Sequence, residues 1–358
     1  MMYKAEFELE AITPIFMRGA NQNRAEIRAP SIKGVMRWWF RALAGNYFGS
    51  DIVGLRKAEE YVFGSTNQRN RVEVHVDCNQ KPRDIIVKFK GNRPIFDKYS
   101  HIHELPYIWF SLKILASKGQ IKRYYPAGTK FTIKLRSPDH KSFKIALATF
   151  WTLVTLGNIG SRNRRGAGSF KFTGGDLDIL KDLSLKWTYA TINDLRESIL
   201  KAIDIIRLEL GVQPRGNLKP QPYPILNEKT SFIGLLDTKA QDPIQALREF
   251  QNKYKTFRQK SVSKKDRIIF GLPINLRGKD IQEISGLQSK LKNSRRASPM
   301  ILGVTSVGGK THIRVVKFKT NPYHPDMELN RFSDWNIMGL FDKNIQEFPV
   351  FGSLEVFK

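Results

Sequence analysis

Three arginines lie among glycines in the segment from Gly157 to Phe172, GNIGSRNRRGAGSFKF. Guanidinium groups bind phosphate oxygens through paired hydrogen bonds, and the backbone N–H groups of a glycine-rich turn also donate to anions. We therefore predict that the arginines contact phosphate and that the glycines let a phosphate approach the backbone. The residues concerned are Gly160, Arg162, Arg164, Arg165, Gly166 and Gly168. Whatever the function, these glycines also suit a helix end and turns of positive φ.

Two more specific nucleotide-binding motifs do not fit. Residues 165–172 keep the arginine and the final phenylalanine of the RRM signature, but Ala167 and Ser169 stand where its stacking aromatic residues belong. A phosphate-binding P-loop would end in Gly-Lys-Ser/Thr before a helix. Gly309-Lys310-Thr311 instead precedes a β-branched run, with Val304 in place of the first glycine. For the glycine-rich segment, the interpretation that remains is phosphate contact without nucleotide hydrolysis.

A second set of cations lies on a helix that we expect to begin with Ser31 as its N-cap. Lys33, Arg37 and Arg41 follow at intervals of four and so line one side, opposite an apolar side. No acidic residue stands at i+4 to neutralise them, which favours phosphate contact. We add Arg18, from the preceding loop, to this predicted phosphate-binding set. Trp38, on the flank of the helix, fits the core better than base stacking.

The segment SHIHELP holds the candidates for acid–base catalysis, His101 and His103. One residue apart, they would face the same side of a strand, and a histidine can move a proton during RNA cleavage. No third metal ligand is suggested by the spacing, and no paired carboxylates or nucleophilic series stand out. We therefore predict no catalytic residue, no metal and no cofactor, and keep an endoribonuclease as the alternative.

The charge of the chain points to a polyanionic partner. Sixty Lys and Arg against thirty-three Asp and Glu give a formal net charge of +27. Such an excess attracts nucleic acid and releases its counterions on binding, although acidic partner proteins would also suit it. The only cysteine, Cys78, excludes an internal disulfide. An alternating, charged N-terminus and the lack of a long apolar run predict a cytoplasmic protein without a membrane partner.

Hydrophobic periodicity supplies the elements that must hold these residues. We expect strands at 3–13, 71–77, 84–90, 107–115, 130–136 and 169–172, and a helix at 143–156 before the glycine loop. Beyond it we expect helices at 191–210 and 242–260, and strands at 267–275 and 300–319. This order predicts an α+β fold of two domains, 1–175 and 176–358, with helices packed on one face of each sheet.

Several motifs together resemble the RAMP superfamily of CRISPR proteins. They are TPIFMRG, the helix sequence RAPSIKGVMRWWFRAL and the glycine-rich loop; FGS at 63–65, FGLPI at 270–274 and RRASPM at 295–300 narrow the resemblance to the first subunit of type III-B Cmr effector complexes. The resemblance implies two ferredoxin-like (RRM-like) domains with antiparallel sheets. It also implies a non-catalytic subunit near the 3′ end of the guide RNA, with guide RNA, target RNA and other RAMP subunits as partners. The alternative it leaves is a RAMP endoribonuclease that processes guide precursors.

Overall fold

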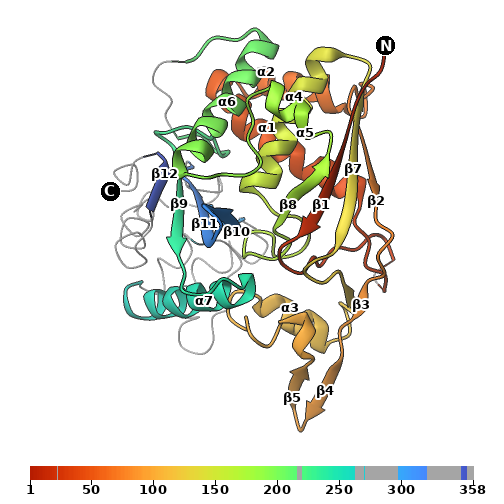
Figure 1. Ribbon diagram of the computed structural model, residues 1–358, viewed down its shortest axis with the longest axis vertical. Helices are drawn as coiled ribbons and strands as arrows, with labels where there is room; N and C mark the ends of the chain where they lie inside the picture. The colour runs from red at the N-terminus through yellow and green to blue at the C-terminus, as the bar shows by residue number, and fades with distance from the viewer. Residues whose placement is uncertain (22, 216–219, 263–269, 271–296, 321–347, 353–358) are drawn as a thin grey trace, which may run out of the picture.

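Two four-stranded antiparallel sheets organise the chain (Figure 1). The structure is a computed structural model and describes residues 1–358 apart from 22, 216–219, 263–269, 271–296, 321–347 and 353–358. The predicted strand at 267–275 therefore lies outside the described residues, except for Phe270. Among the described residues, no helix has the length and apolarity needed to cross a bilayer.

The first sheet has one buried and one solvent-facing side. Its strands are β1 (Tyr3–Ala11), β2 (Glu73–Asp77), β7 (Lys130–Ser137) and β8 (Phe170–Gly175), in the order β2-β7-β1-β8. Alternating residues such as Phe7 and Leu9 are buried, because successive side chains of a strand point to opposite faces. Helices α1 (Ala29–Phe48), α2 (Ile52–Phe63) and α4 (His140–Leu156) form the layer that covers this buried side.

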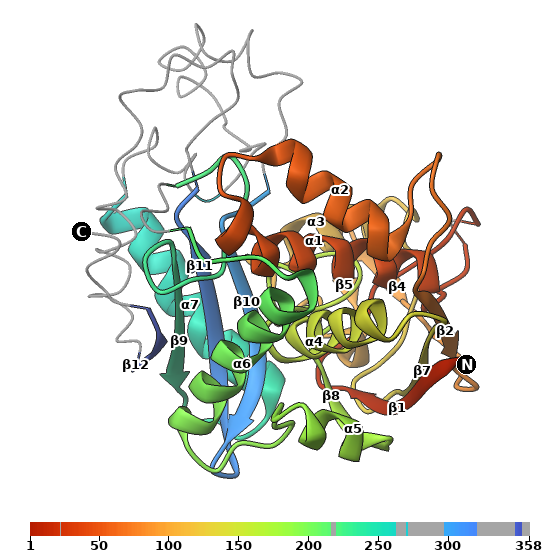
Figure 2. The ribbon, with the colours of Figure 1, turned by 90° about the horizontal axis from the view of Figure 1, so that it is seen from above.

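The second sheet is buried on both faces. Its strands are β9 (Ser231–Asp237), β10 (Met300–Val307), β11 (Lys310–Phe318) and β12 (Phe348–Phe351), in the order β10-β11-β9-β12. Leu236 and Ile313 share a core with Leu247 of α7 (Pro243–Lys260). The opposite face joins the core of α1, α4 and α6 (Ile192–Leu210), and Figure 2 shows α4 and α6 close to β10 and β11. The expectation of helices on one face therefore holds for the first sheet and is wrong for the second.

The two sheets repeat one topology. When the strands of each sheet are numbered along the chain, strand one lies between strands three and four, and strand two pairs with strand three at the edge of the sheet. The first unit runs β1, α1, α2, β2, β7, α4, β8, and the second runs β9, α7, β10, β11, β12 among the described elements. The same strand order therefore occurs twice along the chain.

Two predicted elements differ from the structure. Helix α1 begins at Ala29 with Arg28 as N-cap and no side-chain cap bond; the proline at position 30, whose fixed φ suits a first turn, sets the start in place of Ser31. The expected strand at 107–115 is instead the helix α3 (Phe110–Ser117), preceded by a turn. Trp109 at the N-cap and Leu112 and Ala116 within the helix are buried and recur at helical spacing. Over so short an apolar run, the sequence pattern alone cannot tell a helix from a strand.

A smaller lobe extends from the first unit between β2 and β7. The predicted strand at 84–90 divides into β3 (Arg83–Asp84), which pairs with β6 (Arg123–Tyr124), and β4 (Val87–Lys90), which pairs with β5 (Arg93–Phe96). The β4–β5 hairpin projects away from both sheets (Figure 1). The short helices η1 (Lys98–Ser100) and α5 (Leu177–Asp182) complete the described elements.

Candidate nucleic-acid interface

The glycine loop joins the two sheets. It follows α4, leads into β8 and runs beside β10, where the N–H of Leu302 donates to the carbonyl of Arg164 over 3.3 Å. The amide of Asn158 donates to the carbonyl of Leu302 over 2.6 Å. On the other side, the N–H of Ser161 donates to the carbonyl of Phe16 over 2.7 Å. The loop is therefore fixed on both sides by backbone contacts.

The glycines of the loop meet protein atoms rather than open space. Gly160, Gly166 and Gly168 have φ values of 84°, 82° and 71°, which favour glycine. A Cβ atom at Gly166 would lie 2.6 Å from Leu247, and one at Gly168 would collide with the carbonyl oxygen of Ile159. At Gly166 and Gly168 the chain itself fills the space that a side chain would need, which accounts for the two glycines without a ligand. The phosphate contact at these positions stays a prediction.

Arg165 is committed to structural hydrogen bonds. Its guanidinium donates to Ser298 Oγ over 3.0 Å and to the carbonyl of Phe270 over 2.9 Å, and burial lowers its pKa. Its own carbonyl accepts a bond from the indole N–H of Trp109 over 3.0 Å. Arg165 is therefore bonded within the protein, and its predicted contact with phosphate would compete with these bonds.

Arg164 and Arg162 are less fully bonded. The guanidinium of Arg164 donates to the carbonyl of Ser298 over 2.6 Å and lies 4.8 Å above the ring of Trp38. Arg162 adopts a φ of 60°, and its buried Nε has no partner among the described residues. Burial, followed by repulsion from Arg165, lowers the pKa of Arg162 and of Arg164 to about 10. No acidic side chain of the described residues pairs with any of the three arginines.

The cationic stripe of α1 has a carboxylate partner from α2. Glu59 is 5% exposed and lies 2.5 Å from Arg37 Nε and 2.7 Å from Arg41 Nη1. The lack of an acidic residue at i+4 within α1 therefore does not mean that its arginines are unpaired, because the carboxylate comes from α2. Lys33 is half-buried, and burial followed by repulsion from Arg37 lowers its pKa.

Arg18 and Trp38 also have partners within the protein. Arg18 is half-buried and donates to the carbonyl of Gln120. Trp38 packs edge-on against Trp39 and Phe318, with ring centroids 4.9 and 5.5 Å apart. Trp38 thus joins the core, as the sequence favoured, while one face also receives Arg164.

The histidine pair lies in a turn rather than a strand. His101 has a φ of 56°, and its Nδ1 lies 2.7 Å from Glu104 Oε1, while His103 Nε2 lies 4.0 Å from the same oxygen. The amide of Gln245 from α7 donates to the other oxygen of Glu104 over 3.4 Å. No group of three or more potential metal ligands occurs among the described residues.

Sequence reasoning missed Asn158, Gly303 and Arg314. The guanidinium of Arg314 donates to the carbonyls of Thr155 and Gly157, and to Asn158 Oδ1 over 3.1 Å. Gly303 lies directly opposite Arg314 in the β10–β11 pair, and any side chain there would collide with the guanidinium. Asn158 lies more than a hundred positions from Gly303 and Arg314, and only the fold brings the three together, so no local pattern marks them.

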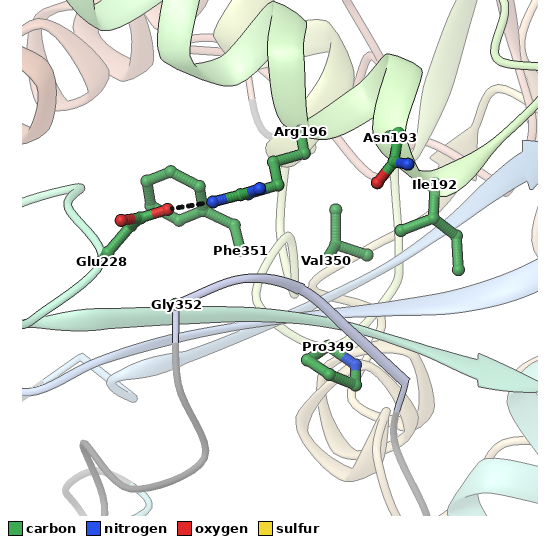
Figure 3. A pocket seen from close by; sticks show the side chains of 8 residues that line it. All are labelled: Ile192, Asn193, Arg196, Glu228, Pro349, Val350, Phe351 and Gly352. Carbon is green, nitrogen blue, oxygen red and sulfur yellow. Dashed lines mark hydrogen bonds and ion pairs between the residues drawn. The ribbon is translucent and has the colours of Figure 1, made fainter.

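A cavity of about 260 Å³ between α6 and β12 offers no free cation (Figure 3). Arg196 is the only basic residue that lines it among the described residues, and its Nη2 lies 2.9 Å from Glu228 Oε1. The remaining lining comes largely from Val350, Phe351 and their neighbours in β12. A bound anion would have to displace Glu228, so this cavity does not extend the interface.

Comparisons with known proteins agree along the chain. Residues 8–171 match the RAMP superfamily, and residues 237–352 match the family described as Cmr1-like, C-terminal. The chain is 37% identical over 345 residues to the CRISPR system Cmr subunit Cmr1-1 of Pyrococcus furiosus, covering 95% of each protein. The crystal structure of apo Cmr1 from Pyrococcus furiosus matches with a TM-score of 0.70 at 33% identity, over 98% of this chain and 99% of that one.

A more distant solved structure shares the fold. A chain of the type III-B Cmr-beta complex bound to cognate target RNA matches with a TM-score of 0.60 at 17% identity, over 88% of this chain and 94% of that one. The mixed α/β architecture with antiparallel sheets is therefore common to these proteins.

Proposed function

Because the chain belongs to the Cmr1 family of the RAMP superfamily, we propose that it is a non-catalytic, RNA-binding subunit of a type III-B CRISPR (Cmr) effector complex. It contacts guide RNA, target RNA or both, near the 3′ end of the guide, and serves antiviral defence. Its other partners are RAMP subunits of the same complex. One solved relative belongs to a Cmr-beta complex bound to cognate target RNA, which supports this assignment.

The observation that carries the proposal is the incomplete neutralisation of the glycine loop. Three guanidinium groups lie in one short segment without an acidic partner among the described residues. Their lowered pKa values show that burial already disfavours their charge. A phosphate group would offset this cost with charge-assisted hydrogen bonds. Arg162, whose Nε is unpartnered, is the strongest candidate, followed by Arg164.

The other predicted RNA-binding residues form the flanks of this interface in our proposal. Lys33 is half-buried on α1, and Arg37 and Arg41 share a single carboxylate. Two cations opposite one anion leave a net positive charge available to an RNA backbone. Arg18 donates one hydrogen bond to the carbonyl of Gln120, and its other donors are proposed to contact phosphate. Backbone contacts at Gly160, which is half-buried, and at Gly166 and Gly168 also stay part of the proposal.

We also infer that each sheet belongs to a ferredoxin-like unit and that the units divide near residue 175. The order of strands and the β-α-β-β-α-β sequence of the first unit support this assignment. Helix α6 lies after that division and packs on α1 and α4 of the first unit, so the two units share one continuous core.

A binding experiment tests the function directly. Purified full-length chain is titrated against labelled single-stranded guide RNA and guide precursor, with and without a chelator, and the RNA is then inspected for cleavage. We expect binding without cleavage in both conditions. Cleavage of the precursor by the chain alone would favour the endoribonuclease, and absence of RNA binding with retained assembly into the complex would favour a purely structural subunit.

A further inference from the structure

A cavity of about 340 Å³ lies beyond the glycine loop, between the free edges of the two sheets. Strands β8 and β10 are the end strands of their sheets, and both line the cavity. The N–H of Val304 in β10 donates to Ser169 Oγ, just before β8, over 3.2 Å and closes one end. The volume lies within the usual range of small-ligand sites and can hold one nucleotide.

The lining combines aromatic rings with cations. Trp187 and Tyr189 border it, together with Phe172 of β8. Arg314 and Lys171 supply positive charge, although Lys171 Nζ also lies 3.7 Å from Glu10 Oε1, outside the lining. None of the described residues that line the cavity is acidic. Flat rings that stack on a base, beside cations that meet a phosphate, are the combination that single-stranded nucleic acid requires.

Arg314, which lines the cavity, has a buried guanidinium whose hydrogen-bond donors are not all paired. Its side chain is 1% exposed, and burial lowers its pKa to about 9. Two of its nitrogens are bonded to α4 and to Asn158, but its Nε has no partner among the described residues. A buried donor without a partner is costly, and an acceptor on a ligand would remove that cost.

The cavity adjoins the proposed phosphate contacts. Asn158, in the glycine loop, accepts from both Arg314 and Ser169 Oγ. Along β10, Leu302 is bonded to Arg164, and the cavity begins at Val304, about 7 Å further at the rise of a strand. A single RNA strand can therefore reach both places.

We propose that this cavity binds one unstacked nucleotide of the RNA, with its base against Trp187 and its polar atoms facing Arg314 and Lys171. The proposal rests on the proposed RNA-binding function. It adds a base-holding site to a surface otherwise built for phosphate. An extended peptide from another subunit would also fit between two free strand edges. The incompletely bonded guanidinium of Arg314, the ring of Trp187 and the lack of an acidic residue among the described lining residues favour RNA.

Filling the cavity tests the proposal. Thr305 lines it on the same face of the sheet as Arg314, because Gly303 lies opposite Arg314 and side chains alternate. The variant Thr305→Trp would occupy the space with a residue that strands accept. The matched control is Thr132→Trp, in the middle of β7 on the solvent-facing side of the first sheet. Trp187→Ala is a second variant, which removes the stacking ring without adding bulk.

The full-length variants are titrated with single-stranded RNA that carries one fluorescent adenine analogue at successive positions. At one position we expect a fluorescence change that the wild type and Thr132→Trp show, and that Thr305→Trp and Trp187→Ala lose. Both cavity variants should also weaken binding about 5- to 100-fold, the effect of losing one stacked base. Thermal melting identifies a variant that fails to fold, and Trp187→Ala then carries the test.

The outcomes separate this proposal from the function on which it rests. Wild-type binding with unchanged affinity and fluorescence in both cavity variants would overturn the base site and leave the RNA-binding function intact. Absence of RNA binding by the wild type would overturn both. If Thr305→Trp binds RNA normally and instead weakens assembly with the other Cmr subunits, the cavity is a protein contact and the proposal is wrong.

Discussion

Arg162 and Arg165 lie three positions apart, but their surroundings give the two guanidinium groups different roles. Arg165 bonds to Ser298 and Phe270, so its side chain joins the loop to segments far along the chain. Arg162 has a buried Nε without a partner among the described residues. One arginine therefore stabilises the fold, and the other is the proposed RNA contact.

Alanine substitutions should separate these roles. Arg165→Ala leaves several acceptors without a donor and should lower the free energy of unfolding by about 1–3 kcal/mol. Arg162→Ala should leave thermal melting nearly unchanged and weaken RNA binding about tenfold or more, because a hydrogen bond to a charged group contributes about 1.5–3 kcal/mol. Melting curves and RNA titrations of both variants provide the check. An Arg162→Ala protein that melts early and binds normally would reverse the assignment.

The histidine turn should be dispensable for RNA chemistry. His101 is held by Glu104, which also receives Gln245 from α7, so its contacts are those of a structural turn. Replacing His101 and His103 with alanine should leave RNA binding, and any RNA cleavage by the assembled complex, at the level of a His75→Ala control. Loss of cleavage with intact binding would support the endoribonuclease.

At the scale of elements, periodic segments could be predicted and tertiary contacts could not. The amphipathic patterns located β1, α4, α6 and α7 to within a few residues. Thr191 and Asp194 form the capping box of α6. The short run at 107–115 was misread because strand and helix patterns coincide over so few residues. The pairing of Glu59 with Arg37 and Arg41 could not be predicted, because residue spacing within α1 says nothing about side chains that come from another helix.

The glycines provide a test of how the loop is built. Gly168→Ala should destabilise the fold strongly, because φ is 71° and the new Cβ would collide with the carbonyl of Ile159. Gly34→Ala is the matched control in α1, where a Cβ meets nothing within 4 Å, and should stabilise the protein by about 1 kcal/mol. Thermal melting measures both. Equal melting temperatures for Gly168→Ala and the wild type would show that the loop can relax.

The start of α6 should give a pH-dependent contribution to stability. Hydrogen bonds from Lys186 and then from the Thr191 backbone lower the pKa of Asp194 to about 2, against an ordinary 3.8. Because the folded-state pKa is the lower one, the stabilisation is complete above pH 3.8 and is lost as the pH falls through about 2. The melting temperature of Asp194→Asn should therefore lie below that of the wild type at pH 7, and the difference should shrink below pH 4. Asp182→Asn, in exposed surroundings, controls for the loss of one charge.

At the scale of the whole molecule, the relation between the two units lay beyond sequence reasoning. The α+β composition of both halves was predicted from the sequence, but the burial of the second sheet on both faces was not. It depends on Gly303, which leaves space for Arg314, and on the carbonyls at the end of α4 that receive this arginine. These contacts place the glycine loop against the edge of β10, so the candidate interface exists only where the units meet.

The net charge of +27 leads to a prediction about salt. If the RNA is held through its phosphates, the logarithm of the affinity should fall linearly with the logarithm of the salt concentration, by roughly 0.7 per contact. Arg162→Ala should reduce this slope by about 0.7. Lys134→Ala should not change it, because Lys134 lies 3.4 Å from Glu6 and 3.0 Å from Asp77 on the solvent-facing side of the first sheet. RNA titrations at several salt concentrations measure all three slopes. A slope near zero in the wild type, with strong binding, would mean that the excess charge serves another partner and that stacking or shape holds the RNA.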